Sequence, residues 1–157
     1  MAEGIFLHQV KARGLETKYA ADSAGTGDWH IGHNADPRSI AAARKNGVPV
    51  PSIARQVQIS DFQNFDLIVA MDRANQADLE SLSAKVPAAS IKAKIVLMRQ
   101  FDPEVNIGQN TRPTSHGKHL DVPDPYYGGP EDFDQVFQIL NRSCQQFMEE
   151  LEKTYLF

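Results

Sequence analysis

Residues 124–129 place a carboxylate next to two aromatic side chains, in the order Asp-Pro-Tyr-Tyr-Gly-Gly. The proline biases Asp124 toward extended backbone geometry and away from the right-handed helical region. Tyr126 and Tyr127 supply a rigid aromatic surface, and the glycines allow the chain to turn. A carboxylate beside an aromatic wall suits a general acid that protonates a leaving group on a flat substrate. A surface turn in which the tyrosines only pack is the alternative interpretation.

A second polar cluster, Asp-Ser-Ala-Gly-Thr at residues 22–26, contains Ser23 and is followed by Trp29, the only tryptophan. The cluster comes just after a predicted strand, at the edge where open α/β sheets usually bind ligands. The alternative is a polar turn with one partly buried indole. Arg38 and Arg55 could each pair with a carboxylate or contact a phosphate, and the residue types alone favour neither.

Histidines occur in two pairs spaced by three residues, His30/His33 and His116/His119. Neither pair lies near a cysteine or a cluster of carboxylates at metal-ligand spacing, so ordinary surface histidines are favoured over a metal site. No cofactor is expected. Cys144 falls on the apolar stripe of a predicted helix, which favours a buried thiol over a reactive nucleophile. The sequence contains no G-x-S-x-G, Walker or G-x-G-x-x-G motif.

Composition places the chain among single-domain globular proteins. Its 157 residues are 41% hydrophobic, which is enough for a core of their own, and no repeat or change of composition marks a second domain. The net charge of -4 and the lack of a basic block argue against nucleic acid or an anionic membrane as the main partner. One cysteine excludes an internal disulfide. Because there is no apolar run of ~18 residues and no signal-peptide pattern, we expect a cytoplasmic location.

Four helices are predicted. Apolar residues in the C-terminal region recur at spacings of three and four, which predicts a helix over residues 130–153. Three further helices are expected over residues 1–11, 36–47 and 72–82. The last two of these begin at an aspartate that can cap the first turn.

Short apolar runs between these helices predict strands at residues 19–22, 67–71 and 93–98. Helices that alternate with buried strands favour an α/β fold, in which a parallel sheet is covered on both faces. Residues 102–123 have little periodicity and several prolines and glycines, so we expect a long functional loop there. The helix at residues 1–11 comes where a doubly wound sheet normally has its first, central strand.

These motifs, taken in chain order, resemble the low-molecular-weight protein tyrosine phosphatases, especially the bacterial ones. The matching segments are Met1-Ala2-Glu3, Asp22-Ser23-Ala24-Gly25-Thr26, Trp29-His30-Ile31-Gly32, Asp36-Pro37-Arg38, Ala54-Arg55-Gln56, Asp61-Phe62, Phe65-Asp66-Leu67-Ile68, Met71-Asp72-Arg73-Ala74-Asn75 and Val122-Pro123-Asp124-Pro125-Tyr126-Tyr127-Gly128. The resemblance covers essentially the whole chain, residues 1–157, as one domain. It implies a Rossmann-like doubly wound parallel sheet of four strands, with helices on both faces.

The resemblance also implies a hydrolase that acts on phosphotyrosine-containing proteins or aryl phosphates without a metal. In this family a cysteine thiolate attacks phosphorus, and water then hydrolyses the cysteinyl-phosphate. Asp124 corresponds to the family's general acid, and Trp29, Tyr126 and Tyr127 correspond to the walls of the slot that admits a phenyl ring. Ser23 matches the serine that orders the phosphate-binding loop.

The sequence departs from the family at the nucleophile. The family's C-x5-R-[ST] loop and the strand before it precede the position that matches Met1, and residues 1–157 contain no such loop. Cys144 is followed six positions later by Glu150, not by an arginine. We therefore expect the chain to be N-terminally incomplete, to lack the first central strand, and to be inactive as it stands.

Two other functions fit the same resemblance. A pseudo-phosphatase that has lost its active loop would serve as a binding or regulatory domain, although such a domain has no need of a proton donor at Asp124. An arsenate reductase of the same fold needs further cysteines to relay a disulfide, and Cys144 is the only cysteine here.

Overall fold

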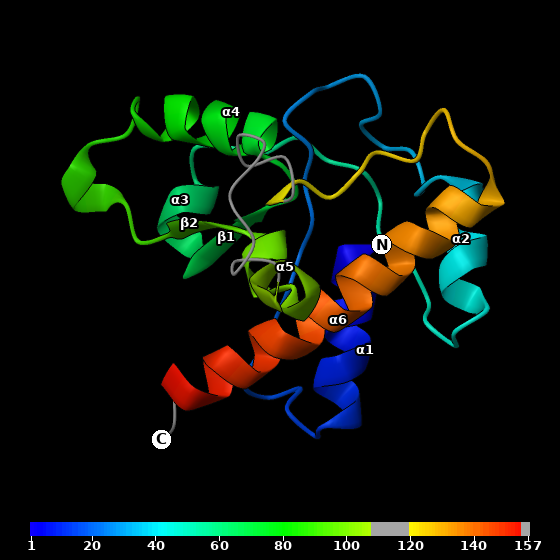
Figure 1. Cartoon of the computed structure of the whole chain (residues 1–157). Helices are drawn as coiled ribbons and strands as arrows, with labels where there is room; N and C mark the ends of the chain where they lie inside the picture. Colours follow the sequence, from blue (N-terminus) through cyan, green and yellow to red (C-terminus); the bar gives the residue numbers. More distant parts are fainter. Residues whose placement is uncertain (108–119, 155–157) are drawn as a thin grey trace.

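A short parallel sheet lies between two groups of helices (Figure 1). The computed structural model of the chain describes residues 1–107 and 120–154. Strands β1 (Leu67–Ala70) and β2 (Lys94–Leu97) pair in parallel, in a register that places the first residue of β1 opposite the first residue of β2. The helices of the described residues are α1 (Ala2–Ala12), α2 (Pro37–Arg44), α3 (Asp61–Asn64), α4 (Arg73–Ser83), η1 (Ala88–Ser90), η2 (Met98–Phe101), α5 (Pro103–Ile107) and α6 (Pro130–Thr154).

The four helices predicted from periodicity and capping are confirmed. The region expected at residues 130–153 is α6, and the regions expected at 1–11, 36–47 and 72–82 are α1, α2 and α4. Helix α2 ends at Arg44, earlier than predicted, and Gly47 then takes a left-handed φ of 72° that favours glycine. None of the helices in the described part of the chain is long and apolar enough to cross a membrane.

Two of the three predicted strands are confirmed, as β1 and β2, but the strand expected at residues 19–22 is wrong. A strand needs a neighbour for its backbone N–H and C=O groups. In the described residues the sheet has only two strands, and the nearest ladder contact is the isolated parallel bridge between Gly25 and Gln56. The sheet is therefore smaller than the four strands that the family resemblance implies.

The expectation of an irregular loop over residues 102–123 is also wrong in part. Residues Pro103–Ile107 form α5. Asp102 lies just before the helix, and its Oδ1 accepts a hydrogen bond from the N–H of Glu104 at 3.0 Å. An aspartate followed by proline is a typical helix start. The remainder of the predicted loop at residues 108–119, with the pair His116/His119, lies outside the described residues.

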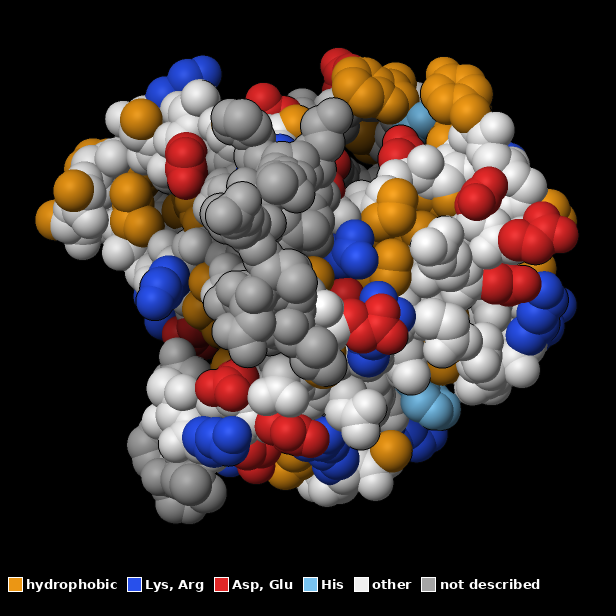
Figure 2. Space-filling view, in the orientation of Figure 1, with side chains coloured by type: hydrophobic (Ala, Val, Ile, Leu, Met, Phe, Trp, Pro, Cys, Tyr) orange, Lys and Arg blue, Asp and Glu red, His pale blue; other side chains and the backbone are white. Residues whose placement is uncertain are grey.

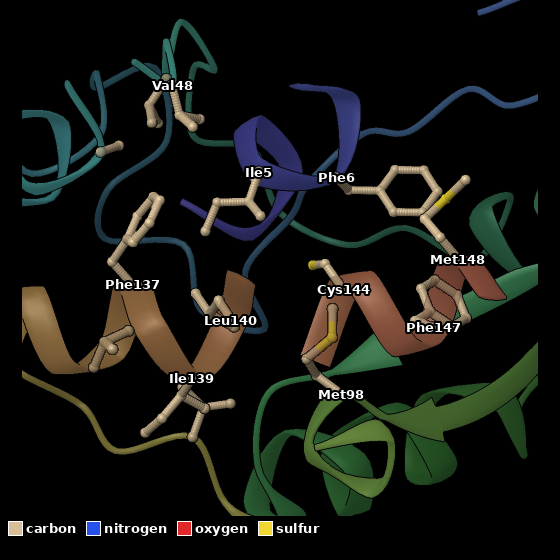
Figure 3. Packing of buried hydrophobic residues seen from close by; sticks show 14 of the residues in the cluster. Ile5, Phe6, Val48, Met98, Phe137, Ile139, Leu140, Cys144, Phe147 and Met148 are labelled. Carbon is tan, nitrogen blue, oxygen red and sulfur yellow. The ribbon is translucent and has the colours of Figure 1, made fainter. Parts of the chain in front are cut away.

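The main core forms where α1, α2 and α6 pack together. The side chains on the two faces of β1 belong to two separate hydrophobic clusters. Figure 3 shows Ile5 of α1 pointing toward α6, where Leu140 and Cys144 lie. The Phe6 and Phe147 rings have centroids 5.7 Å apart. Alternate residues of β1 pack against this core, while the others join a second cluster with α3, α4 and β2. This alternation is the period of two that a strand buried on both faces requires.

Asp72 caps α4, because its Oδ1 accepts a hydrogen bond from the backbone N–H of Asn75 at 2.7 Å. Replacing Asp72 with alanine removes that acceptor, so we expect the free energy of unfolding to fall by about 1 kcal/mol in urea titrations. Asp78 is exposed in the same helix and supplies the control, since its alanine variant should stay within about 0.5 kcal/mol of the parent. An equal loss in both variants would contradict the capping role.

Candidate active site

The segment that carries Asp124 runs past the C-terminal end of β1 and turns into α6. The N–H of Val122 donates to the carbonyl of Met71, the residue after β1, at 2.8 Å. Asp124 Oδ1 accepts the N–H of Tyr126 at 3.0 Å, and the carbonyl of Pro125 accepts the N–H of Gly128 at 2.8 Å. Asp124 is exposed, so its carboxyl group lies in a turn at the edge of the sheet and is open to solvent.

Tyr126 and Tyr127 present a largely exposed aromatic surface next to this carboxylate. Tyr126 is 50% exposed and Tyr127 is 97% exposed, and their rings meet edge to face at a centroid distance of 5.0 Å. In Figure 2, hydrophobic side chains gather along the upper edge of the molecule, where Figure 1 shows the blue loop that leads to α2 and the yellow segment that leads into α6. The alternative interpretation, a surface turn in which the tyrosines only pack, is not tested by these exposures, and the role of the rings stays a prediction.

The guanidinium of Arg38, in α2, packs against the Tyr126 ring. It lies 5.5 Å from the centroid of Tyr126 and 4.6 Å from that of Phe133, at cation–π distances. The guanidinium donates two hydrogen bonds to the Asp36 carboxylate, from Nε at 3.1 Å and from Nη2 at 2.8 Å. The hydrogen bonds from Arg38 hold the pKa of Asp36 below its ordinary value. Arg38 is thus occupied by a carboxylate and two rings.

Ser23 lies beside the first turn of α1. Its hydroxyl donates to Oε2 of Glu3, and its backbone N–H donates to Asp22 Oδ1 at 2.9 Å. The segment before α2 is therefore tied to the start of α1. Whether Ser23 orders a phosphate-binding loop stays a prediction, because no such loop is among the described residues.

Arg55 joins the same segment to α3. Its Nε donates to Asp22 Oδ2 at 2.8 Å, and its Nη1 and Nη2 donate to Asp61 at 2.9 and 3.2 Å. Burial alone would raise the pKa of Asp61, but hydrogen bonds from Arg55 and from the Gln58 N–H outweigh it and hold that pKa below its ordinary value. Of the two interpretations left open for Arg55, the structure supports the ion pair.

Trp29 lies in a loop that backbone hydrogen bonds fix to the chain before α3. Gly32 N–H donates to Ala54 O, and Ala54 N–H donates to His33 O, both at 2.8 Å. The indole is 74% exposed rather than partly buried, and its ring neighbour is His30, with centroids 6.4 Å apart. Among the residues that the structure describes, no ring contact joins Trp29 to the tyrosines, so the predicted walls of the slot are not in contact.

Cys144 is a buried core residue, as its place on the apolar stripe predicts. Its side chain is 0% exposed, and burial raises its pKa to about 12. The attacking form of a cysteine is the thiolate, which a pKa this high makes scarce near neutral pH. Cys144 is therefore unsuited to nucleophilic attack on a phosphate ester.

The burial of Cys144 predicts slow chemical modification. In the folded protein we expect the thiol to react with a disulfide reagent such as dithiobis(nitrobenzoate) at least about 10²-fold more slowly than in urea, because the reagent needs a solvent-accessible thiolate. Absorbance of the released thiolate measures both rates. A folded-state rate close to the rate in urea would contradict this placement.

The described histidine pair, His30 and His33, has ring centroids 6.1 Å apart. Across residues 1–107 and 120–154, no group of three or more histidine, cysteine, aspartate or glutamate side chains is placed to hold a metal ion. The pair His116/His119 lies outside these residues, so the absence of a metal site stays a prediction.

Sequence reasoning missed a buried carboxylate, Asp102, which is 0% exposed and lies between two arginines. Arg142 of α6 donates to it from Nε at 2.7 Å and from Nη2 at 3.1 Å, and Arg99 of η2 donates from Nε at 3.1 Å. The signal was present, because Asp102-Pro103 repeats the Asp36-Pro37 pattern that marked α2. The arginine partners carry no such local signal.

The chain is similar to known phosphatases over nearly its whole length. A family model described as "Low molecular weight phosphotyrosine protein phosphatase" matches residues 1–155. A phosphatase of that description from Schizosaccharomyces pombe is 36% identical over 152 residues, which are 96% of this chain and 87% of the relative. A low molecular weight protein-tyrosine-phosphatase of Streptomyces coelicolor is 40% identical over 140 residues, covering 89% of this chain and 77% of the relative.

The fold of the chain is also similar to that of a solved phosphatase structure over nearly its whole length. The crystal structure of a protein tyrosine phosphatase from Entamoeba histolytica with Hepes in the active site superposes with a TM-score of 0.80 at 36% identity. The superposition covers 98% of this chain and 88% of that chain. The likeness therefore extends to the fold as a whole and not only to the quoted motifs.

Proposed function

Because the chain belongs to the low molecular weight phosphotyrosine protein phosphatase family, we propose that it hydrolyses phosphotyrosine in proteins and related aryl phosphates. The observation that carries the proposal is the family match over residues 1–155 in a chain whose Asp-Pro-Tyr-Tyr segment presents an exposed carboxylate beside two exposed rings. Tyr126 and Tyr127 would contact the flat face of the substrate ring, and Trp29 would close the slot from the opposite loop.

Asp124 would act as the general acid. The leaving tyrosyl oxygen has a pKa of about 10, so it departs poorly as an anion and needs a proton in the transition state. The Tyr126 N–H bonds Oδ1 at 3.0 Å, which fixes the orientation of the carboxyl group and leaves Oδ2 to carry the proton. The same carboxylate would then accept a proton from the water of the second step.

We place the nucleophile outside residues 1–157. No C-x5-R-[ST] loop occurs in these residues, and Cys144 is buried with a raised pKa. Within the described residues β1 is paired on one edge only, by β2, so the sheet offers an edge for the strand that precedes such a loop in the family. A thiolate supplied there would attack phosphorus, with backbone N–H groups and an arginine holding the phosphoryl oxygens.

The proposed reaction has two steps. The thiolate forms a sulfur–phosphorus bond while the bond between phosphorus and the aryl oxygen breaks, and the proton of Asp124 passes to the aryl oxygen. Water next attacks phosphorus and gives its proton to the Asp124 carboxylate, while the sulfur–phosphorus bond breaks and inorganic phosphate leaves. Residues 1–157 alone hold the acid but not the attacking sulfur, and we propose that they are inactive by themselves.

A paired assay tests the proposal. Turnover of a phosphotyrosine peptide is measured for residues 1–157 and for the protein expressed from its complete reading frame. We expect turnover only from the latter. Turnover by residues 1–157 at ordinary efficiency would refute the placement of the nucleophile, and no turnover from either protein would favour the pseudo-phosphatase, a binding or regulatory domain.

A further inference from the structure

Hydrogen bonds to Asp121 and Val122 hold the chain just ahead of Asp124. The backbone carbonyl of Asp121 accepts from Arg99 Nη1 at 3.0 Å, and its side chain accepts the N–H of Arg73 at 2.9 Å. The N–H of Val122 donates to the carbonyl of Met71 at 2.8 Å. The bond to Met71 ties the segment to the end of β1, the bond from Arg73 ties it to the start of α4, and the bond from Arg99 ties it to η2.

Arg99 is the member of this set that reaches into the protein interior. Its Nε donates to Oδ2 of Asp102 at 3.1 Å, so one guanidinium bonds a buried carboxylate and the Asp121 carbonyl at the same time. Only 20% of the Arg99 side chain is exposed. Because a guanidinium is planar with donors at fixed angles, holding one side of it on Asp102 directs the other side at Asp121.

Asp102 is a rigid anchor for this contact. Arg142 of α6 bonds both of its oxygens, and the N–H of Glu104 bonds Oδ1 at 3.0 Å. Burial alone would raise the pKa of Asp102, but these hydrogen bonds outweigh it and hold that pKa below its ordinary value. The carboxylate thus stays charged, and its position is fixed from α6 and α5.

We propose that Arg99 is a positioning residue for the general acid: it carries the fixed position of Asp102 to the Asp121 carbonyl, and so sets where the carboxyl group of Asp124 lies. The inference rests on the proposed function, because positioning matters only if Asp124 gives a proton to the substrate. A shift of ~1 Å in a reacting group can cost about 10²-fold in rate. Arg99 itself would not touch the substrate.

The first arm of the test measures the backbone directly and needs no activity. In residues 1–157, Arg99→Gln should speed hydrogen exchange of the Val122 amide about tenfold or more, the effect of losing a bond from a charged donor nearby. The matched control is Arg142→Gln, which removes a partner of the same carboxylate but has no bond to Asp121. Because Arg99 and the Glu104 N–H still bond Asp102 in that variant, it should speed Val122 exchange, relative to that of Val96 in β2, clearly less than Arg99→Gln does.

The second arm uses the enzyme expressed from its complete reading frame. Arg99→Gln should lower kcat/KM for a phosphotyrosine peptide by up to about 10²-fold, and much less for p-nitrophenyl phosphate, whose more acidic phenol needs less protonation. A lysine at position 99 can bond Asp102 or the Asp121 carbonyl, but not both at once. We therefore expect Arg99→Lys to recover more of the free energy of unfolding than of the parent ratio of kcat/KM for the two substrates. In an Asp124→Asn background, Arg99→Gln should add no further change in the ratio of the two substrates.

Each outcome decides between explanations. Equal exchange at Val122 in the Arg99→Gln and Arg142→Gln variants, or an unchanged substrate ratio in Arg99→Gln, would overturn the positioning role. If Arg99→Gln does not fold, Arg99→Lys carries both arms with the same criteria. A different result would contradict the proposed function itself: Asp124→Asn alone would leave the ratio of kcat/KM for the two substrates as it is in the parent enzyme.

Discussion

Replacing Asp124 with asparagine in the enzyme expressed from its complete reading frame is expected to lower kcat/KM for a phosphotyrosine peptide by about 10²–10⁴. Asparagine keeps the size of the side chain and an oxygen that can accept the Tyr126 N–H, but it has no proton to give to the leaving tyrosyl oxygen. The quantity to compare is kcat/KM, because it reports the steps up to departure of that oxygen.

The leaving group distinguishes acid catalysis from a binding effect. A loss that is large for phosphotyrosine and small for p-nitrophenyl phosphate identifies a missing proton, whereas an equal loss for both identifies poorer binding. Asp134→Asn is the matched control, since Asp134 lies on α6 and its carboxylate pairs with Lys45 at 3.0 Å rather than with a group of the Asp-Pro-Tyr-Tyr turn. An equal effect of the two substitutions would contradict the role of Asp124.

Replacing Asp102 with alanine is expected to lower the free energy of unfolding at pH 7 by about 3 kcal/mol, the lower end of the range for breaking a buried ion pair. The carboxylate is 0% exposed, and both of its oxygens are bonded by Arg142. The arginine side chains are 20% and 25% exposed and can turn partly to water, which limits the loss. Urea unfolding measures the change.

Acid should remove this contribution. The pKa of Asp102 in the folded protein lies below its ordinary value. The carboxylate therefore contributes its full stabilisation at pH values above the unfolded-state pKa of ~3.9. This contribution is lost as the pH falls through the lower folded-state pKa. The difference between parent and Asp102→Ala should therefore shrink when the titration is repeated near pH 3. Asp66, whose side chain is 74% exposed, provides the control, and its alanine variant should change stability by less than about 0.5 kcal/mol.

The parts of the fold that were predictable are those with a local cause. The apolar spacing of α6 and the capping aspartates of α2 and α4 act within a few residues, so sequence alone locates these helices. The segment at residues 19–22 has the composition of a strand, but a strand exists only where a second one bonds to it, and composition cannot supply that partner. Helices as short as α3 and α5 carry too little periodicity to be detected.

The candidate site divides in the same way. The Asp-Pro-Tyr-Tyr turn is local, so the position of Asp124 beside the tyrosines followed from residue types and spacing. The support around it is not local. Arg142 bonds Asp102 across 40 positions of the chain, and Arg38 of α2 lies against the Tyr126 ring. Contacts of this kind depend on how the helices pack, and no pattern within one segment encodes them.

The identity of the atom that takes the phosphoryl group decides whether the proposed mechanism operates. Rapid acid quenching of the enzyme expressed from its complete reading frame, during turnover of a phosphotyrosine peptide, followed by mass spectrometry, locates that group directly. We expect a phosphocysteine in a C-x5-R-[ST] segment outside residues 1–157, with Cys144 unmodified. Phosphate on Cys144, or turnover without any phosphocysteine, would contradict the account.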